Sequence, residues 1–214
     1  MEKIFLHNVL PDVFNEQDMP ASDLWRRDIC FAKGDICLVE AVSGAGKSSL
    51  CSYIYGYRND YSGYISFDDE DLRCFSFSRW SELRRQSLSI LFQELRLFPE
   101  LTAMENVVLK NELTAYKEVS WIHDAFERLE LADKKDAPVS KLSFGQQQRV
   151  ALIRTLCQPI DFLFLDEPVS HLDEENNKRV GELLLAEVKA QGVGMVVTSI
   201  GKQLNIEYTK KLRL

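Results

Sequence analysis

A glycine-rich segment in the first quarter of the chain has the residue types that bind phosphate. It reads Ala41-Val42-Ser43-Gly44-Ala45-Gly46-Lys47-Ser48. In such a turn, backbone N–H groups surround phosphate oxygens, the lysine reaches the β- and γ-phosphates, and the hydroxyl binds Mg²⁺. The pattern usually begins with glycine, so the methyl group of Ala41 is expected to strain the turn if that position requires a positive φ. The residues expected to bind nucleotide here are Ser43, Gly44, Ala45, Gly46, Lys47, Ser48 and Ser49.

Two carboxylates follow an apolar run much later in the chain. The run is Phe162-Leu163-Phe164-Leu165, and Asp166 and Glu167 come directly after it. A continuous apolar run is typical of a parallel strand buried on both faces, and ligands bind at the carboxyl ends of such strands. We expect Asp166 to hold Mg²⁺, directly or through water, and Glu167 to polarise the attacking water as a general base. With Lys47, these residues predict hydrolysis of a nucleoside triphosphate.

Further motifs identify a family. The segment Leu142-Ser143-Phe144-Gly145-Gln146 resembles the signature motif of ABC ATPases (leucine-serine-glycine-glycine-glutamine), with Phe144 in the first glycine position. Gln93 resembles the Q-loop glutamine, Ser170 to Asp173 resembles the D-loop, and Phe14 stands where the family places an aromatic ring that stacks on adenine. These motifs occur in family order over essentially the whole chain. The sequence therefore resembles the ATP-binding subunit of an ABC transporter.

This resemblance implies a fold and an assembly. The fold is an α/β P-loop NTPase of ABC type, with a mostly parallel core sheet, an N-terminal antiparallel β part and a helical subdomain. One domain is expected over 1–214, with the subdomain at about 101–158. In the implied head-to-tail dimer, two ATP molecules lie at the interface, and Ser143, Gly145 and Gln146 of one subunit contact the γ-phosphate bound by the other.

The resemblance also implies the roles of the site residues. ATP and Mg²⁺ are the expected ligands. The expected catalytic residues are Glu167, Gln93 and Ser199. The expected metal ligands are Ser48, Gln93 and Asp166. The remaining nucleotide contacts are expected from Phe14, Ser143, Gly145, Gln146 and Asp173.

The stretch from Gln93 to Leu109 indicates which group within the ABC family this sequence resembles most. It contains Leu97-Phe98-Pro99-Glu100-Leu101-Thr102 and resembles the lipoprotein-releasing, macrolide-export and cell-division group of ABC ATPases. Those subunits work with a separate integral membrane permease whose cytoplasmic helix docks near the Q-loop. The same stretch also fits a Q-loop region shared by many importers. The working dimer contains two copies of this chain, or one copy and a different ABC subunit.

One position departs from the family pattern. After the last strand the family usually has threonine and histidine, whereas this chain has Thr198 and Ser199. Serine is shorter than histidine and is never cationic. Losing one transition-state contact costs about 2.7–4 kcal/mol, so we expect slower hydrolysis with ATP binding kept, and Ser199→His is expected to raise turnover. The alternative function is a hydrolysis-poor, nucleotide-switched subunit that acts structurally or in a heterodimer.

Alternating elements must position these residues. Apolar and β-branched runs predict strands at 28–32, 36–39, 64–67, 89–92, 162–165 and 195–198. Helical spacing of apolar residues predicts helices at 47–55, 103–131, 144–156 and 174–191. Strands that alternate with helices indicate a mostly parallel sheet.

Composition excludes several other classes. The chain has 214 residues and a formal net charge of −7, which disfavours nucleic acid as a partner. Soluble ABC proteins of DNA repair or translation usually carry long coiled-coil insertions or two ATPase domains, and this acidic sequence shows neither. It has no apolar run of about 20 residues, and its start lacks the signal-peptide pattern. We therefore expect a cytoplasmic protein held at the inner face of the membrane by its permease. The five cysteines include no C-x-x-C pair, so reduced, buried thiols are expected.

Overall fold

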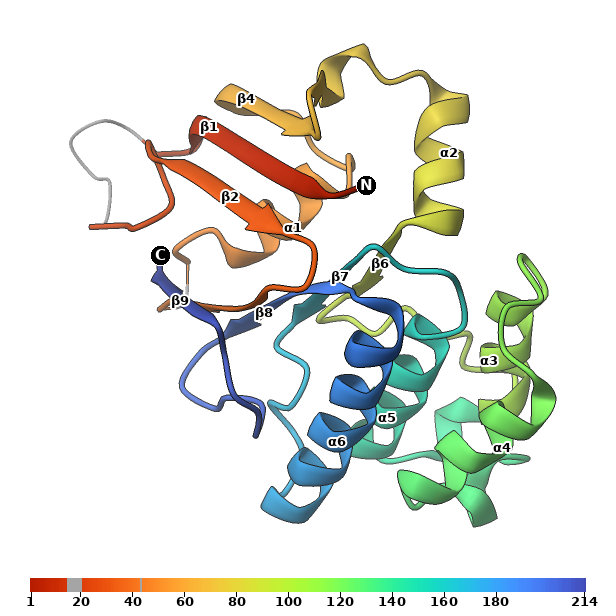
Figure 1. Ribbon diagram of the computed structural model, residues 1–214. Coiled ribbons are helices and arrows are strands. Elements are labelled where there is room, and N and C mark those ends of the chain that lie inside the picture. Colours follow the sequence, from red (N-terminus) through yellow and green to blue (C-terminus); the bar gives the residue numbers. More distant parts are fainter. Residues whose placement is uncertain (15–20, 43) are drawn as a thin grey trace.

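The computed structural model describes residues 1–14, 21–42 and 44–214, which form two sheets and six α-helices (Figure 1). Ser43 and residues 15–20 lie outside the described residues. None of the α-helices in the described part of the chain has the length and hydropathy needed to cross a membrane.

The smaller sheet is antiparallel, and its strand order is β2-β1-β4-β5. Leu6 of β1 lies opposite Ile29 of β2 and Ile65 of β4, and all three side chains are buried. The strands are β1 (Lys3–Pro11), β2 (Asp28–Ala32), β4 (Tyr61–Phe67) and β5 (Glu70–Asp71).

The larger sheet is parallel, and its order is β6-β7-β8-β3-β9. Its strands are β6 (Leu88–Leu91), β7 (Phe162–Asp166), β8 (Gly194–Ser199), β3 (Ile36–Glu40) and β9 (Lys210–Arg213). Every residue of β7 and β8 is buried, as the continuous apolar runs indicate. Because side chains alternate along a strand, Leu163 and Leu165 join one hydrophobic core while Phe162 and Phe164 join the other.

The helices cover the two faces of the parallel sheet unequally. Helix α1 contacts β7 from the side of the antiparallel sheet, whereas α5 and α6 run side by side along the other face, with α3 and α4 beyond α5 (Figure 1). The helices are α1 (Lys47–Ile54), α2 (Phe77–Gln86), α3 (Ala103–Asn111), α4 (Val119–Arg128), α5 (Phe144–Thr155) and α6 (Glu174–Gln191). Short 3-10 turns lie at Leu72–Cys74, Ala132–Lys134 and Val139–Lys141.

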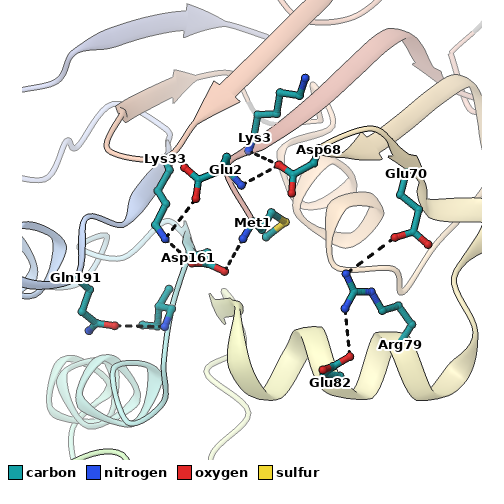
Figure 2. Close-up of polar contacts among 11 residues, drawn as sticks. Met1, Glu2, Lys3, Lys33, Asp68, Glu70, Arg79, Glu82, Asp161 and Gln191 are labelled. Atoms are coloured by element: carbon teal, nitrogen blue, oxygen red, sulfur yellow. Dashed lines mark hydrogen bonds and ion pairs between the residues drawn. The ribbon is translucent and has the colours of Figure 1, made fainter.

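Contacts at the amino end connect the two sheets (Figure 2). Asp161, just before β7, accepts hydrogen bonds from Lys33 Nζ at 2.7 Å and from the Met1 amino group at 3.1 Å. Asp68 accepts the backbone N–H groups of Glu2 and Lys3 at 2.8 and 2.9 Å. The acidic turn after β4 therefore holds the start of β1 through these two hydrogen bonds to Asp68.

The fold class predicted from the sequence is confirmed: a parallel core sheet and an antiparallel sheet beside it. The predicted helix at 103–131 is wrong as a single element, because α3 ends at Asn111 and α4 begins at Val119. Between them, Ala115 has φ +49°, and the Asn111 amide bonds both backbone groups of Lys117. The strands β1, β5 and β9 and the helix α2 were not predicted.

The cysteines differ in environment. Burial raises the pKa of the thiols of Cys37 and Cys157 to about 12, and it also raises the pKa of Cys51. These three are buried as expected, but Cys30 and Cys74 are exposed, so the expectation was wrong for those two.

Candidate active site

The phosphate-binding segment joins β3 to α1. Gly46 is the N-cap of α1 and has φ +95°, and Gly44 has φ +84°, so both adopt a conformation that favours glycine. Lys47 is the first residue of α1 and is buried. Ala41 is not among the described residues with positive φ, so its methyl group does not strain the turn.

Two aromatic side chains lie against this segment. Trp25, which is buried, donates its indole N–H to the Ala45 carbonyl at 3.0 Å. A Cβ on Gly46 would lie 3.0 Å from the Trp25 ring and 3.4 Å from the Phe14 ring. The predicted adenine-stacking residue Phe14 is therefore beside the phosphate-binding segment. Trp25 was missed by the sequence analysis, since a lone tryptophan carries no motif.

The carboxylate at the end of β7 meets the hydroxyl at the start of α1. Ser48 Oγ donates to Asp166 Oδ2 at 2.8 Å, and Thr198 Oγ1 donates to Asp166 Oδ1 at 2.5 Å. Asp166 and Thr198 are both buried. A hydroxyl and a carboxylate held together are the oxygen donors that Mg²⁺ prefers, so this pair fits the expected ion.

Glu167 adopts an unusual backbone conformation, with φ +52°. Its carboxylate lies 3.6 Å from the Lys47 ammonium, measured between Oε1 and Nζ. Its backbone carbonyl accepts hydrogen bonds from Gln148 Nε2 at 3.0 Å and from Ser170 Oγ at 3.3 Å. Gln148 of α5 thus stabilises the turn that positions Glu167. The sequence motif does not reveal this contact.

Lys47, Ser48 and Glu167 line one pocket of about 280 Å³, whereas Asp166 and Phe14 are not among its described lining residues. Its chemistry combines an ammonium group, hydroxyls, a carboxamide and a carboxylate, which suits a phosphate chain and an attacking water. It is lined by Gly44, Gly46, Lys47, Ser48, Ser49, Gln93, Glu167 and Ile200. Most of the predicted residues of the phosphate site are therefore brought together at this pocket, while Ala45 is buried and is not among the described lining residues.

The end of β8 differs from expectation. Ser199 is 3% exposed, and its hydroxyl donates to the Lys202 carbonyl at 2.6 Å. Among the described lining residues, the one from this loop is Ile200 rather than Ser199. The Lys202 ammonium in turn bonds the Leu172 carbonyl, which fastens the loop to the segment before α6.

The signature residues form the start of α5. Ser143 Oγ accepts the Gln146 N–H at 3.3 Å, and Gln146 Oε1 accepts the Ser143 N–H at 2.9 Å, which makes a capping box. A Cβ on Gly145 would lie 3.1 Å from the His171 carbonyl oxygen, so a larger residue would crowd that segment. The ring of Phe144 meets that of His171 at a centroid distance of 4.3 Å.

These residues lie apart from the phosphate pocket. None of Ser143, Gly145 and Gln146 is among the described residues that line it. Asp173 is the N-cap of α6 and accepts the Asn176 N–H at 2.8 Å, a bond that lowers the pKa of Asp173. Within one subunit, the signature and Asp173 are thus on helix starts rather than around the pocket.

Comparison with known proteins agrees with this geometry. A sequence model of the ABC transporter family matches residues 27–170. Lipoprotein-releasing system ATP-binding protein LolD 1 of Caulobacter vibrioides is 31% identical over 86% of this chain and 81% of its own length. ABC transporter ATP-binding protein YtrE of Bacillus subtilis is 32% identical over 78% of this chain and 73% of its own length.

Solved structures support the fold. The dimeric bacterial ABC transporter cassette MJ0796 has a TM-score of 0.77 and 24% identity, covering 92% of this chain and 87% of that one. The same cassette in a post-hydrolysis state bound to ADP and Pi has a TM-score of 0.74 at 24% identity, covering 93% and 88%.

The fold and the phosphate pocket define a P-loop ATPase cassette. The chain belongs to the ABC transporter family, as an ATP-binding subunit. Lipoprotein-releasing subunits are among its relatives, as the stretch from Gln93 to Leu109 indicates.

Proposed function

We propose that this subunit hydrolyses ATP at the described pocket and thereby drives a separate membrane permease. The observation that carries the proposal is the meeting of four groups from two distant segments. Lys47 and Ser48 begin α1, while Asp166 and Glu167 end β7, and the Lys47–Glu167 and Ser48–Asp166 contacts join them.

Each of these residues has a proposed task. Lys47 and the N–H groups at Gly44 and Gly46 bind the β- and γ-phosphates. Glu167 accepts a proton from the attacking water, and Gln93 helps to orient that water. Phe14 stacks on adenine beside the phosphate-binding segment. Ser43, which the described residues do not include, stays a predicted contact.

Ser48, Asp166 and Gln93 are the proposed ligands of Mg²⁺. When bound, the ion neutralises charge on the phosphate oxygens. The chain itself positions the Ser48 and Asp166 oxygens for the ion, because Thr198 fixes the second carboxylate oxygen of Asp166.

The signature residues act on a second subunit in this proposal. Ser143, Gly145 and Gln146 are placed at the N-terminus of α5, where the helix dipole favours an anion. We infer that they contact the γ-phosphate bound by the partner subunit, with Asp173 beside them. A helical subdomain at about 101–158 carries this helix start within the single domain.

The permease is the proposed second partner. The subunit contacts it through residues near Gln93, and this holds the subunit at the cytoplasmic face of the membrane. The relationship to a lipoprotein-releasing ATP-binding protein supports a separate permease. Neither partner is nucleic acid, in keeping with the net charge of −7.

The test is steady-state ATP turnover of the purified chain, with a fluorescent nucleotide analogue to follow binding. We expect Glu167→Gln to lose turnover and to keep nucleotide affinity, whereas the control Glu174→Gln, at an exposed carboxylate on α6, changes neither. Wild-type turnover that matches Glu167→Gln would refute hydrolysis, and failure to bind the analogue would refute the site itself.

One observation favours the second candidate, a switch that binds ATP and hardly hydrolyses it. The β8 loop brings the apolar Ile200 to the pocket, while the Ser199 hydroxyl is bonded to its own loop. Such a subunit would dimerise with ATP and show no turnover above the Glu167→Gln variant.

A further inference from the structure

Trp25 contacts the phosphate-binding segment from the core, and no sequence motif accounts for it. Its side chain is 1% exposed, and its indole N–H donates to the Ala45 carbonyl at 3.0 Å. A buried indole usually finds an acceptor of this kind. Because the acceptor here is a backbone carbonyl of the phosphate-binding segment, the bond fixes the orientation of one peptide unit in that segment.

That peptide unit joins Ala45 to Gly46. A trans peptide is planar, and its C=O and N–H groups point in opposite directions. Since the Ala45 carbonyl is turned toward Trp25, the Gly46 N–H is turned away from the indole. Gly46 lines the phosphate pocket, and none of the described residues accepts a hydrogen bond from its N–H. The Gly46 amide is therefore a donor at the pocket whose direction is set by the bond to Trp25.

The indole ring also restricts the backbone at Gly46. A Cβ at this position would lie 3.0 Å from Trp25 Cζ2, and the residue has φ +95°. The other glycine of the turn, Gly44, would have nothing within 4 Å of its Cβ. Glycine has more conformational freedom than any other residue, so a glycine-rich turn needs outside contacts to keep one conformation. Trp25 supplies such a contact at Gly46.

Trp25 is itself held by the turn that precedes it. Ser22 Oγ accepts the Trp25 backbone N–H at 2.9 Å. Asp23 and Arg213 of β9 exchange two hydrogen bonds, from the Asp23 N–H to the Arg213 carbonyl at 2.8 Å and from the Arg213 N–H to Asp23 Oδ2 at 2.9 Å. Strand β9 pairs with β3, which leads into the phosphate-binding segment. The indole and the segment it contacts are thus supported by the same pair of strands.

We propose that Trp25 is a positioning residue, whose indole N–H holds the Ala45 carbonyl so that the Gly46 N–H faces the phosphates of the nucleotide. This rests on the proposed function, because it concerns the phosphate pocket assigned there. Trp25 is not among the described residues that line the pocket, so it acts through the backbone. Its loss should weaken the binding of the β- and γ-phosphates and leave the adenine contact of Phe14 unchanged.

The test compares the affinities of the full chain for ATP and AMP, each measured by displacement of a fluorescent nucleotide analogue. Both ligands carry adenine, so the ratio of the two affinities reports the contacts to the β- and γ-phosphates. Trp25→Phe keeps an aromatic ring and removes the N–H donor. We expect this variant to bind ATP about fivefold to tenfold more weakly and to bind AMP as the wild type does.

The matched control is Trp121→Phe. It removes an equivalent bond, from Trp121 Nε1 to Glu187 Oε1 at 3.0 Å, between α4 and α6. This control should keep the wild-type ratio of ATP to AMP affinity. An unchanged ratio in Trp25→Phe, or an equal loss in Trp121→Phe, would make Trp25 an ordinary core side chain and overturn the inference. A wild-type chain that binds ATP no tighter than AMP would refute the phosphate pocket, and with it the proposed function.

A second readout leaves Trp25 in place, so it stands even where Trp25→Phe does not fold. The chain has three tryptophans, and the double variant Trp80→Phe/Trp121→Phe keeps only Trp25. Hydrogen bonds at the two ends of one peptide unit polarise each other. Saturating ATP should therefore change the fluorescence emission of Trp25, whereas AMP should not. The same emission with both nucleotides would contradict the role proposed for Trp25.

Discussion

At the scale of single residues, the loop after β8 determines which side chains are available to contact phosphate in the pocket. Ser199 points its hydroxyl at the Lys202 carbonyl, and Ile200 lines the pocket instead. A serine that is already bonded offers no second donor to a phosphate, because it has one O–H. The polar contact expected after β8 is therefore absent from the described lining of the pocket.

We predict that Ser199→His raises ATP turnover by up to about 10²-fold, because histidine supplies one further contact to the transition state. The same change costs about 1 kcal/mol of stability through loss of the bond to Lys202. Turnover and urea unfolding measure the two effects. Ile200→His is the matched variant. If only Ile200→His gains turnover, the missing contact belongs to position 200. If Ser199→His shows no gain while ATP still binds, the role assigned to Ser199 is contradicted.

At the scale of elements, two helices begin with the same device. Thr102 and Glu105 form a capping box at α3, as Ser143 and Gln146 do at α5. Sequence alone predicts a helix at each, because the cap residue and the residue three positions later satisfy each other's backbone groups.

The two caps give a matched pair of variants. Thr102→Ala and Ser143→Ala are each expected to cost about 1 kcal/mol of stability by urea unfolding. If Ser143 also contacts the nucleotide of the partner subunit, only Ser143→Ala weakens ATP-dependent dimerisation, measured by gel filtration. Equal dimerisation of the two variants would leave Ser143 with a capping role alone.

A nearly buried ion pair joins α6 to the residues at the start of α4. Glu187 accepts from the Lys117 ammonium, from Trp121 Nε1 at 3.0 Å and from Gln191 Nε2 at 3.1 Å. The side chains of Lys117 and Glu187 are 11% and 10% exposed. Removing one partner of such a pair leaves an uncompensated charge.

Glu187→Ala is accordingly predicted to cost about 3–5 kcal/mol in the free energy of unfolding, measured in urea. The double variant Lys117→Met/Glu187→Leu should recover most of that loss, because neither charge is then left buried. A loss below about 1 kcal/mol for Glu187→Ala would indicate that the pair is solvated.

At the scale of the whole molecule, Asp161 helps to hold the two sheets together (Figure 2). Burial alone would raise its pKa, but hydrogen bonds from Lys33, Ser87 and the Met1 amino group lower it below its ordinary value. A carboxylate with a lowered folded-state pKa stabilises the fold above its unfolded pKa, and this contribution is lost as the pH falls through the folded value.

Asp161→Asn should therefore cost about 1–2 kcal/mol at pH 7, and the gap to the wild type should narrow as the pH falls below about 4. Urea unfolding at pH 7 and near pH 3 measures both values. Asp69→Asn is the control, since Asp69 is exposed and pairs only at the surface. A gap that stays constant with pH would show that the charge of Asp161 is not what stabilises the fold.

The sequence by itself determined the family, the alternation of strands and helices, and the two segments that carry phosphate chemistry. These follow from local patterns: the glycines and lysine before α1, and the apolar run that ends in Asp166 and Glu167. Such patterns can be recognised in a sequence because each one consists of residues that are close together along the chain.

Only the tertiary structure decided which distant groups support those segments. Trp25 contacts Ala45, Gln148 holds the Glu167 turn, and Ile200 replaces Ser199 at the pocket. The break after Asn111 likewise depends on side-chain bonds rather than on apolar spacing. None of these has a sequence signal, because each partner is chosen by the packing of elements far apart in the chain.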